Sequence, residues 1–303
     1  MLERRRSGKL RHLLEINDLT VDELQQVLTL ARSDAPPQVL AGKGMALVFE
    51  KPSLRTRNSM EMAVAQLGGH PVYIQGDEVG LDTRESVEDV TNTLAGFHAA
   101  LGARVFSHSV VERMAAVDRV PVVNLLSDAA HPMQALADVL TIIEEFGSVE
   151  GRTVTYVGDS NNVTRSLGLA VGMLGGVFRI ASPTDYSFGN DDLSLLRSTG
   201  AEVQTMTDPF EAVEGCDVVY SDVFTSMGQE EESAIRVKAF ADYQVNGDLM
   251  RAAGDAVFLH CLPAHRGEEV TDEVVDSAAS RVWKLAENRM HAARGYLAFA
   301  LGG

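Results

Sequence analysis

The sequence has 303 residues, of which 45% are hydrophobic, and this is ordinary for a globular protein of one or two domains. Its 26 Lys and Arg residues against 43 Asp and Glu residues give a formal charge of −17, which argues against a nucleic acid or an anionic membrane as the main partner. No apolar stretch reaches the ~18–20 residues of a membrane helix, and two cysteines are too few for a disulfide framework, so we expect a cytoplasmic protein.

Short runs of consecutive apolar residues recur after a basic first segment, Met1–Arg11, that no apolar segment follows and that is therefore not a secretory signal. Consecutive apolar residues are typical of strands that are buried on both faces of a parallel sheet. The expected strands are Met45–Phe49, Pro71–Ile74, Ala103–Phe106, Pro121–Leu125, Thr153–Val157, Val177–Ala181, Glu202–Met206, Val218–Tyr220 and Val257–Leu262.

Segments with apolar residues three and four positions apart separate these strands, as in Ser86–Phe97 and Pro132–Phe146, and predict amphipathic helices. The alternation predicts an α/β fold with two domains, each a parallel sheet flanked by helices, joined by interdomain helices. Gly147 ends a helix before a new strand, so we place residues 1–146 in the first domain and residues 147–286 in the second. We expect Asp272–Leu301 to be largely helical, with residues 287–303 packing back on the first domain.

The first polar turn is Ser53–Arg57, where an apolar strand has ended and a helix begins. It contains two hydroxyl and two guanidinium groups. Helix N-termini leave N–H groups unpaired and carry partial positive charge, so this turn suits a tetrahedral oxyanion such as phosphate. The alternative is that Ser53 only caps the helix and that the arginines lie on the surface.

The second polar turn is His131–Gln134, at the start of the predicted helix Pro132–Phe146. His131 and Gln134 lie three positions apart on the same first turn, where they could orient a carbonyl or an amide group. The alternative is that His131 caps the helix and has no further role.

Two further turns follow buried strands in the second half of the chain. Gly158–Asn162 stands where a dinucleotide turn would stand, but it lacks G-x-G-x-x-G, so NAD binding is disfavoured and a helix cap is the simpler interpretation. Asp222, in the segment Asp222–Gly228, could pair with a cationic ligand or satisfy the N–H groups of its own loop.

The last polar turn is His260–Gly267, which ends an apolar strand at Pro263 and leaves carbonyl groups free to bind a ligand. His260 and His265 are poorly spaced for zinc, and no other ligand cluster is near. Cys261 has no evident base beside it, so thiol catalysis is weakly supported.

Taken together and in this order, these motifs resemble the aspartate/ornithine carbamoyltransferase family, and within it the ornithine-specific members. The resemblance covers nearly the whole chain. It is carried by the carbamoyl-phosphate motif Phe49–Arg57, its partner His131–Gln134, the S-M-G loop in Asp222–Gly228 and the H-C-L-P segment in His260–Gly267. It implies transfer of the carbamoyl group of carbamoyl phosphate to the δ-amine of L-ornithine, which gives L-citrulline and phosphate.

The resemblance also implies the site residues, a cis Leu262–Pro263 bond, no metal or organic cofactor, and a homotrimer or multiple of trimers whose neighbouring subunits share a loop. Arg104, His131 and Cys261 would be the catalytic residues. Carbamoyl phosphate would contact Ser53, Leu54, Arg55, Thr56, Arg57, Arg104, His131, Gln134, Cys261, Leu262 and Arg289. Ornithine would contact Asn162, Asp222, Ser226, Met227, Cys261 and Leu262.

Two positions depart from the family pattern. Leu54 stands where the family usually has Thr, which is tolerated if that position contributes mainly its backbone N–H. Gly80 stands where the loop that reaches the neighbouring subunit often carries Gln or His, and Asp82 or Arg84 could replace that contact.

Three alternatives stay open. The amine could be putrescine, aspartate or an N-acylornithine, although the S-M-G loop and Asp222 fit an amino acid with free α-groups better. The chain could be a catalytically silent binding homologue, as Leu54 and Gly80 would allow. A nicotinamide-dependent oxidoreductase is disfavoured by the missing glycines.

Overall fold

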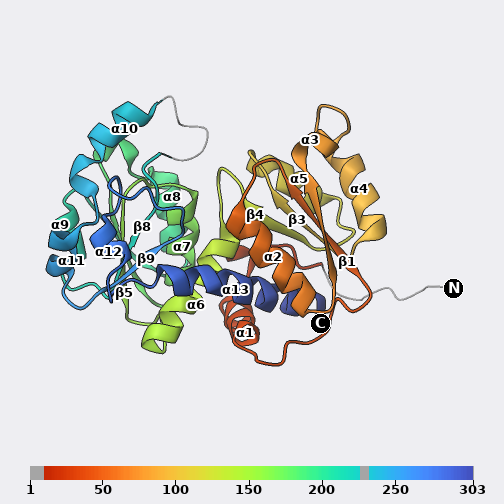
Figure 1. The fold of residues 1–303 in the computed structure, drawn as a ribbon, viewed down its shortest axis with the longest axis horizontal. Helices are drawn as coiled ribbons and strands as arrows, with labels where there is room; N and C mark the ends of the chain where they lie inside the picture. The colour runs from red at the N-terminus through yellow and green to blue at the C-terminus, as the bar shows by residue number, and fades with distance from the viewer. Residues whose placement is uncertain (1–9, 226–231, 303) are drawn as a thin grey trace.

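The computed structural model describes residues 10–225 and 232–302, which form two α/β domains, each built on one parallel sheet (Figure 1). The first sheet has the order β2-β1-β3-β4 and the second has the order β7-β6-β5-β8-β9. The predicted fold class is therefore confirmed. The strands are β1 (Gly44–Phe49), β2 (His70–Gln75), β3 (Ala100–Arg104), β4 (Val122–Leu126), β5 (Thr153–Val157), β6 (Val177–Ala181), β7 (Glu202–Met206), β8 (Val218–Ser221) and β9 (Val257–His260).

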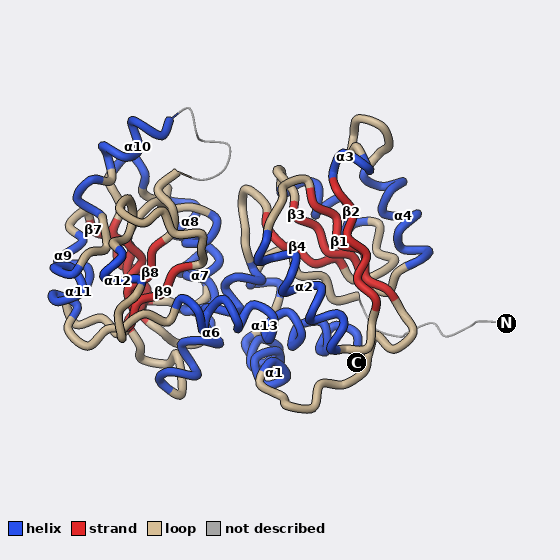
Figure 2. Tube along the Cα trace, in the orientation of Figure 1, coloured by secondary structure: helices blue, strands red, loops and turns tan. Residues whose placement is uncertain are grey.

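Helices flank both sheets and run between them (Figure 2). They are α1 (Val21–Ala31), α2 (Leu54–Gln66), α3 (Gly76–Val79), α4 (Val87–Phe97), α5 (His108–Ala116), α6 (Pro132–Phe146), α7 (Asn162–Met173), α8 (Asn190–Ser198), α9 (Pro209–Val213), α10 (Ser233–Ala239), α11 (Gly247–Ala253), α12 (Asp272–Val275) and α13 (Val282–Gly302).

Most strands are buried on both faces, as their consecutive apolar residues predict, whereas the edge strands β2 and β7 are only partly buried. In β1, Met45 and Leu47 belong to one core cluster and Ala46, which points to the opposite face, belongs to another. The larger cluster continues from the first domain into the second through α6 and α13. Helix α13 packs against α1, α2 and α6, so its length spans the junction between the two sheets (Figure 1).

Several predicted strands differ from the observed ones by one or two residues at an end, and two predicted elements differ by more. The strand expected at Ala103–Phe106 is β3 at Ala100–Arg104, because the ladder with β1 starts at Ala100 and the Phe106 side chain is 54% exposed beyond its end. The helical segment expected at Asp272–Leu301 is interrupted between α12 and α13, where Ser280 forms an isolated bridge with Phe258 of β9.

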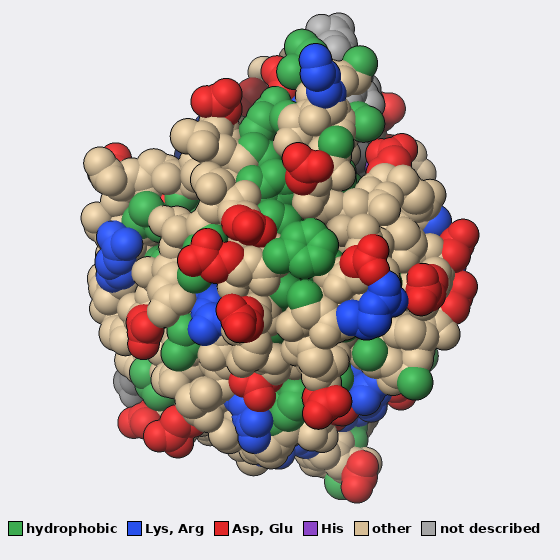
Figure 3. All heavy atoms as spheres, turned by 90° about the vertical axis from the view of Figure 1, so that its left-hand side faces the viewer, with side chains coloured by type: hydrophobic (Ala, Val, Ile, Leu, Met, Phe, Trp, Pro, Cys, Tyr) green, Lys and Arg blue, Asp and Glu red, His purple; other side chains and the backbone are tan. Residues whose placement is uncertain are grey.

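No helix among the described residues is long and apolar enough to cross a membrane. Acidic and basic side chains are interspersed over the face shown in Figure 3, with hydrophobic side chains between them. That face therefore shows no basic patch that would offset the overall charge of −17.

Candidate active site

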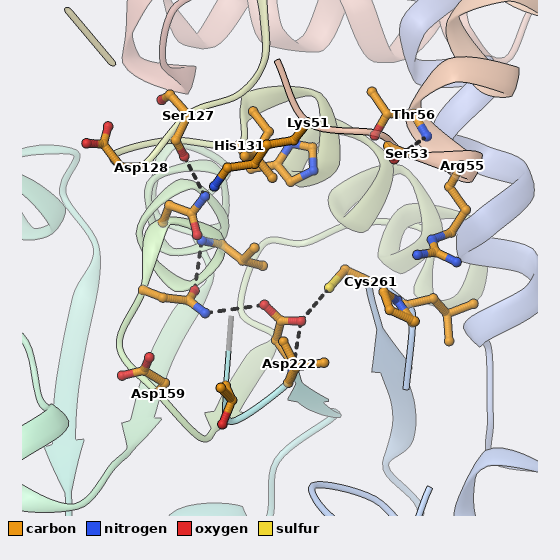
Figure 4. Close-up of a pocket in the computed structure, with 18 of the residues that line it drawn as sticks. Lys51, Ser53, Arg55, Thr56, Ser127, Asp128, His131, Asp159, Asp222 and Cys261 are labelled. Carbon is orange, nitrogen blue, oxygen red and sulfur yellow. Dashed lines mark hydrogen bonds between the residues drawn. The ribbon is translucent and has the colours of Figure 1, made fainter. Parts of the chain in front are cut away.

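A cavity of about 710 Å³ lies between the two domains, at the carboxyl ends of both sheets (Figure 4). This is where parallel α/β sheets bind ligands. The first domain contributes the turn after β1, the end of β3 and the turn after β4. The second domain contributes the turns after β5, β6, β8 and β9, and α10 and α13 add one arginine each.

The first turn of α2 forms one wall of the cavity. Ser53 is its N-cap, and the Ser53 hydroxyl accepts a hydrogen bond from the Thr56 N–H at 3.2 Å. Leu54 and Arg55 occupy the first two helical positions, whose N–H groups have no acceptor within the helix. The Leu54 side chain is 74% exposed, so this residue can present its backbone to the cavity while its side chain stays in water.

Arg55 and Arg57, although predicted together, lie on different faces of α2. Arg55 points into the cavity (Figure 4). Arg57 does not line it: its guanidinium donates to Glu61 at 2.8 Å and lies 3.8 Å from the centre of the Tyr73 ring. Residues two apart on a helix differ by about 200° in direction, so one turn cannot aim both side chains at one ligand. In this structure Arg57 therefore faces away from the cavity, and its contact with carbamoyl phosphate stays a prediction.

Three arginines from distant parts of the chain meet at this wall: Arg55, Arg104 of β3 and Arg289 of α13. Burial, followed by repulsion from the other two arginines, lowers the pKa of Arg104 to about 10. Burial lowers the pKa of Arg289 to about 10 as well, and Arg289 donates to the Thr56 hydroxyl at 2.7 Å. A cluster of cations of which two are buried is unfavourable by itself and favourable with a bound anion, so this wall is suited to a small dianion.

His131 is the N-cap residue of α6 and its buried ring lines the cavity between the two walls. Burial, then the charges of Arg289 and Arg104, holds the pKa of this imidazole well below its usual range, so His131 is neutral. Gln134 is buried beside the cavity and does not line it. Its amide donates to Asp138 at 2.8 Å, and its carbonyl oxygen has no hydrogen-bond partner among the described residues.

Asp222 and Cys261 face each other on the second-domain wall (Figure 4). The Cys261 thiol donates to Asp222 Oδ1 at 2.9 Å, and the Asn161 amide donates to Asp222 Oδ2 at 3.3 Å. Burial, then the Asp222 charge, raises the pKa of Cys261, so the sulfur is a neutral thiol and not a thiolate nucleophile. The bond between Leu262 and Pro263 is cis, as expected.

The remaining predicted ornithine contacts are placed only in part. Asn162 lines the cavity, and its amide donates to the Ser127 carbonyl of the first domain at 2.7 Å. Ser226 and Met227 lie outside the described residues.

Sequence reasoning missed one buried ion pair in the cavity wall, between Asp159 and Arg236 of α10. Arg236 also donates to the Phe224 carbonyl at 2.6 Å and lies over the Tyr186 ring. Burial raises the pKa of Asp159 to about 6 despite this partner. The only sequence signal was the place of Asp159 in a turn after a buried strand, since its partner is 77 positions away.

Among the described residues, two groups of side chains bring potential metal-binding atoms together: Asp222, His260 and Cys261, and His265, Glu268 and Glu269. The atoms of the first group already form hydrogen bonds. Asp222, His260 and Cys261 bring ligand atoms within 4.8 Å, but the thiol donates to the carboxylate. His260 Nδ1 accepts the Leu262 N–H at 2.8 Å, so its Nε2–H donates to Glu269 at 3.1 Å. This arrangement holds the strand end in place and does not present an open set of ligands.

The fold and the cavity are those of a two-domain α/β protein with a cationic wall on one domain and an acidic residue on the other. Residues 11–144 match the model of the aspartate/ornithine carbamoyltransferase carbamoyl-P binding domain, and residues 150–300 match the Asp/Orn binding domain of the same family. The chain belongs to the aspartate/ornithine carbamoyltransferase family.

Individual relatives extend over nearly the full chain. An ornithine carbamoyltransferase of Hyperthermus butylicus is 46% identical over 96% of this chain and 97% of its own length. That of Thermus thermophilus is 48% identical over 94% of this chain and 95% of its own. The solved structure of ornithine carbamoyltransferase from Pyrococcus furiosus superposes with a TM-score of 0.93 at 43% identity, covering 97% of each chain.

Proposed function

We propose that this chain transfers the carbamoyl group of carbamoyl phosphate to the δ-amine of L-ornithine, giving L-citrulline and phosphate. The observation that carries this proposal is the cavity itself, where the buried Arg104 and Arg289 and the half-buried Arg55 meet at the first turn of α2 and face Asp222 across the domain junction. A dianionic donor fits the first wall and a cationic amino acid fits the second. The family membership and the names of the relatives support the same substrates.

Carbamoyl phosphate would bind at the first wall. The backbone of Leu54 and the side chains of Ser53, Arg55 and Thr56 would hold the phosphate, because a helix N-terminus and a guanidinium offer converging donors. Arg104, His131 and Thr56 would contact the carbonyl oxygen, and Arg289 would add charge beside them. The unpaired carbonyl oxygen of Gln134 would accept a hydrogen bond from the carbamoyl amide.

Ornithine would bind at the second wall. Asp222, Asn162, Ser226 and Met227 would hold its α-amino and α-carboxylate groups. Cys261 and the carbonyl group of Leu262 would direct the δ-amine toward the donor. Because the thiol is neutral and paired with Asp222, Cys261 would orient the nucleophile and would not attack the donor itself.

The reaction needs no covalent intermediate with the protein. The neutral δ-nitrogen forms a bond to the carbonyl carbon as electrons move onto the carbonyl oxygen. The tetrahedral intermediate then breaks its bond to the phosphate oxygen, and phosphate leaves with the proton that the nitrogen releases. Arg104 and neutral His131 would stabilise the oxyanion more than the substrate carbonyl, and this difference lowers the barrier.

We also propose a homotrimer or a multiple of trimers, a cytoplasmic location and a domain boundary between residues 146 and 147. The described structure has both cysteines as free thiols, which is consistent with a reducing compartment. Gly80 ends the short helix α3 in a left-handed conformation. A contact with a neighbouring subunit would then come from Asp82 or Arg84, although Asp82 is paired with Arg113 in this chain.

A colorimetric citrulline assay on the purified protein tests this proposal, with carbamoyl phosphate and one amine at a time. We expect product with ornithine and at least about tenfold less turnover per enzyme with the other amines, because putrescine lacks the α-carboxylate, N-acetylornithine lacks the α-amino charge and aspartate lacks the δ-amine. Binding of carbamoyl phosphate without turnover of any amine would indicate a silent homologue. Turnover of another amine in preference to ornithine would refute the substrate assignment.

A further inference from the structure

A chain of hydrogen bonds outside the cavity connects the two domains to His131. The His131 backbone N–H donates to the Ser166 hydroxyl of α7 at 2.9 Å. The Ser166 hydroxyl in turn contacts both carboxylate oxygens of Glu15, at 2.8 and 3.0 Å. Neither Ser166 nor Glu15 lines the cavity, and Ser166 is fully buried while Glu15 is 9% exposed.

Glu15 is itself held in place by its own segment. The Leu13 N–H donates to the Val122 carbonyl at 2.9 Å, and the Asn124 N–H donates to the Leu13 carbonyl at 2.8 Å, so this segment pairs with β4. The Ile16 N–H donates to Glu15 Oε1 at 2.7 Å. Contacts within the first domain therefore hold the Glu15 carboxylate in place, and from there it contacts Ser166 of the second domain.

As a result, both backbone polar groups of His131, its N–H and its carbonyl, are held by hydrogen bonds. Its carbonyl accepts the Gln134 and Ala135 N–H groups of α6 at 3.0 and 3.2 Å, and its N–H is held by Ser166. The ring Nδ1 is buried and has no hydrogen-bond partner among the described residues. The direction of the ring in the cavity therefore depends on how its backbone is held.

We propose that Glu15 and Ser166 are positioning residues that hold His131 in place for carbamoyl transfer. The inference rests on the proposed function, in which His131 contacts the carbonyl oxygen of the donor. Without the Glu15 acceptor, the Ser166 hydroxyl can turn to the carbonyl of Asn162, one helical turn earlier in α7. The His131 N–H then loses its oriented acceptor, and the start of α6 loosens where the imidazole is attached.

Steady-state kinetics on Glu15→Leu, Ser166→Ala and the double variant test this inference, with Glu15→Gln as the conservative change. Leucine keeps the buried volume and removes the acceptor, whereas the glutamine oxygen still accepts from Ser166. We expect each of the first two variants to lower kcat between about 10- and 100-fold, the range for a small misplacement of a catalytic group. The double variant should be no slower than Ser166→Ala, and Glu15→Gln should keep kcat within about threefold of wild type.

Binding of inorganic phosphate, measured by calorimetry, separates positioning from unfolding. Phosphate lacks the carbonyl oxygen that His131 would contact, so its Kd should stay within about twofold of wild type in every variant. Ser194→Ala, an exposed serine on α8, and Glu150→Gln, an exposed glutamate, are the matched controls and should retain full activity.

Unchanged kcat in both Glu15→Leu and Ser166→Ala would overturn the inference, and so would independent losses that add in the double variant. Parallel losses of kcat and phosphate affinity would also overturn it, because they indicate general disruption. If Glu15→Leu does not fold, Ser166→Ala still decides between positioning and no role, because only a positioning role lowers its kcat while phosphate affinity is kept. Absence of citrulline formation by the wild type would overturn the proposed function and this inference with it, whereas an active wild type with unaltered variants overturns the inference alone.

Discussion

Removal of the buried Glu15 charge should stabilise the protein at alkaline pH. Burial raises the pKa of Glu15 from 4.5 to about 7, although hydrogen bonds from Ile16 and Ser166 and the charge of Arg165 act in the opposite direction, and Asp18 adds to the increase. The folded protein thus keeps this proton up to about pH 7, while the unfolded chain releases it near 4.5. The stability from this group is complete below pH 4.5 and is lost as the pH rises through 7.

The size of the effect follows from the difference between the two pKa values. At about 1.4 kcal/mol per pKa unit, the ionised Glu15 disfavours folding by roughly 3 kcal/mol at pH 8. Glutamine keeps the shape and cannot ionise. The free energy of unfolding of Glu15→Gln, relative to wild type, should therefore rise by about 2–3 kcal/mol between pH 5 and pH 8.

Urea unfolding followed by circular dichroism, at fixed protein concentration and at both pH values, measures this difference. Glu150→Gln, which removes an exposed carboxylate, should show no comparable rise with pH. If wild type and Glu15→Gln depend on pH in the same way, the Glu15 carboxyl is not the buried, proton-retaining group described above. If Glu15→Gln is more stable at alkaline pH and also keeps its kcat, the charge of Glu15 affects stability, whereas its oxygen as a hydrogen-bond acceptor affects activity.

Three further predictions concern the cavity. Inorganic phosphate at about 100 times its Kd should raise the free energy of unfolding of the wild type by about 2.7 kcal/mol in calorimetry. Arg55→Ala should abolish this stabilisation and Arg57→Ala should keep it. If Arg57→Ala abolishes it and Arg55→Ala keeps it, the anion binds elsewhere. Asp222→Ala should raise the KM for ornithine or lower kcat by about tenfold or more, as expected for loss of a charged contact, without changing phosphate affinity; proportionate loss of both would mean that the variant unfolds. The kcat/KM for ornithine should rise about tenfold per pH unit above neutrality, because only the neutral δ-amine attacks, and a flat profile from pH 7 to 9 would contradict that step.

The fold was predictable because burial on both faces leaves a clear record in the sequence. The strands at Thr153–Val157 and Val177–Ala181 have the predicted bounds, since turn residues mark both ends, and so does the less buried edge strand Glu202–Met206. The prediction from hydrophobicity was wrong about the bounds of β3. Val105 and Phe106 continue the apolar run, although the pairing of β3 with β1 has already ended at Arg104. The apolar run marks where side chains are buried, whereas hydrogen bonding to β1 decides where the strand stops.

The residues that line the cavity were predictable where one turn carries several polar groups, as at Ser53–Thr56 and His131. The composition of a turn does not separate Arg55, which lines the cavity, from Arg57, which does not, because it carries no information on direction around the helix. The ion pair between Asp159 and Arg236 and the contact between Glu15 and Ser166 join distant parts of the chain. No local pattern predicts such pairs, since their partners meet only after both sheets have formed.

The proposed role of Leu54 shows how a binding surface can tolerate substitutions of one of its residues. When recognition depends on a peptide nitrogen, almost every codon change at that position preserves the donor, and the side chain is free to vary. Proline is the exception, because it suits the first residue of a helix and yet carries no hydrogen on its nitrogen. A leucine that looks out of place in an anion-binding motif is thus compatible with function, and a motif search that demands a hydroxyl there would overlook this chain.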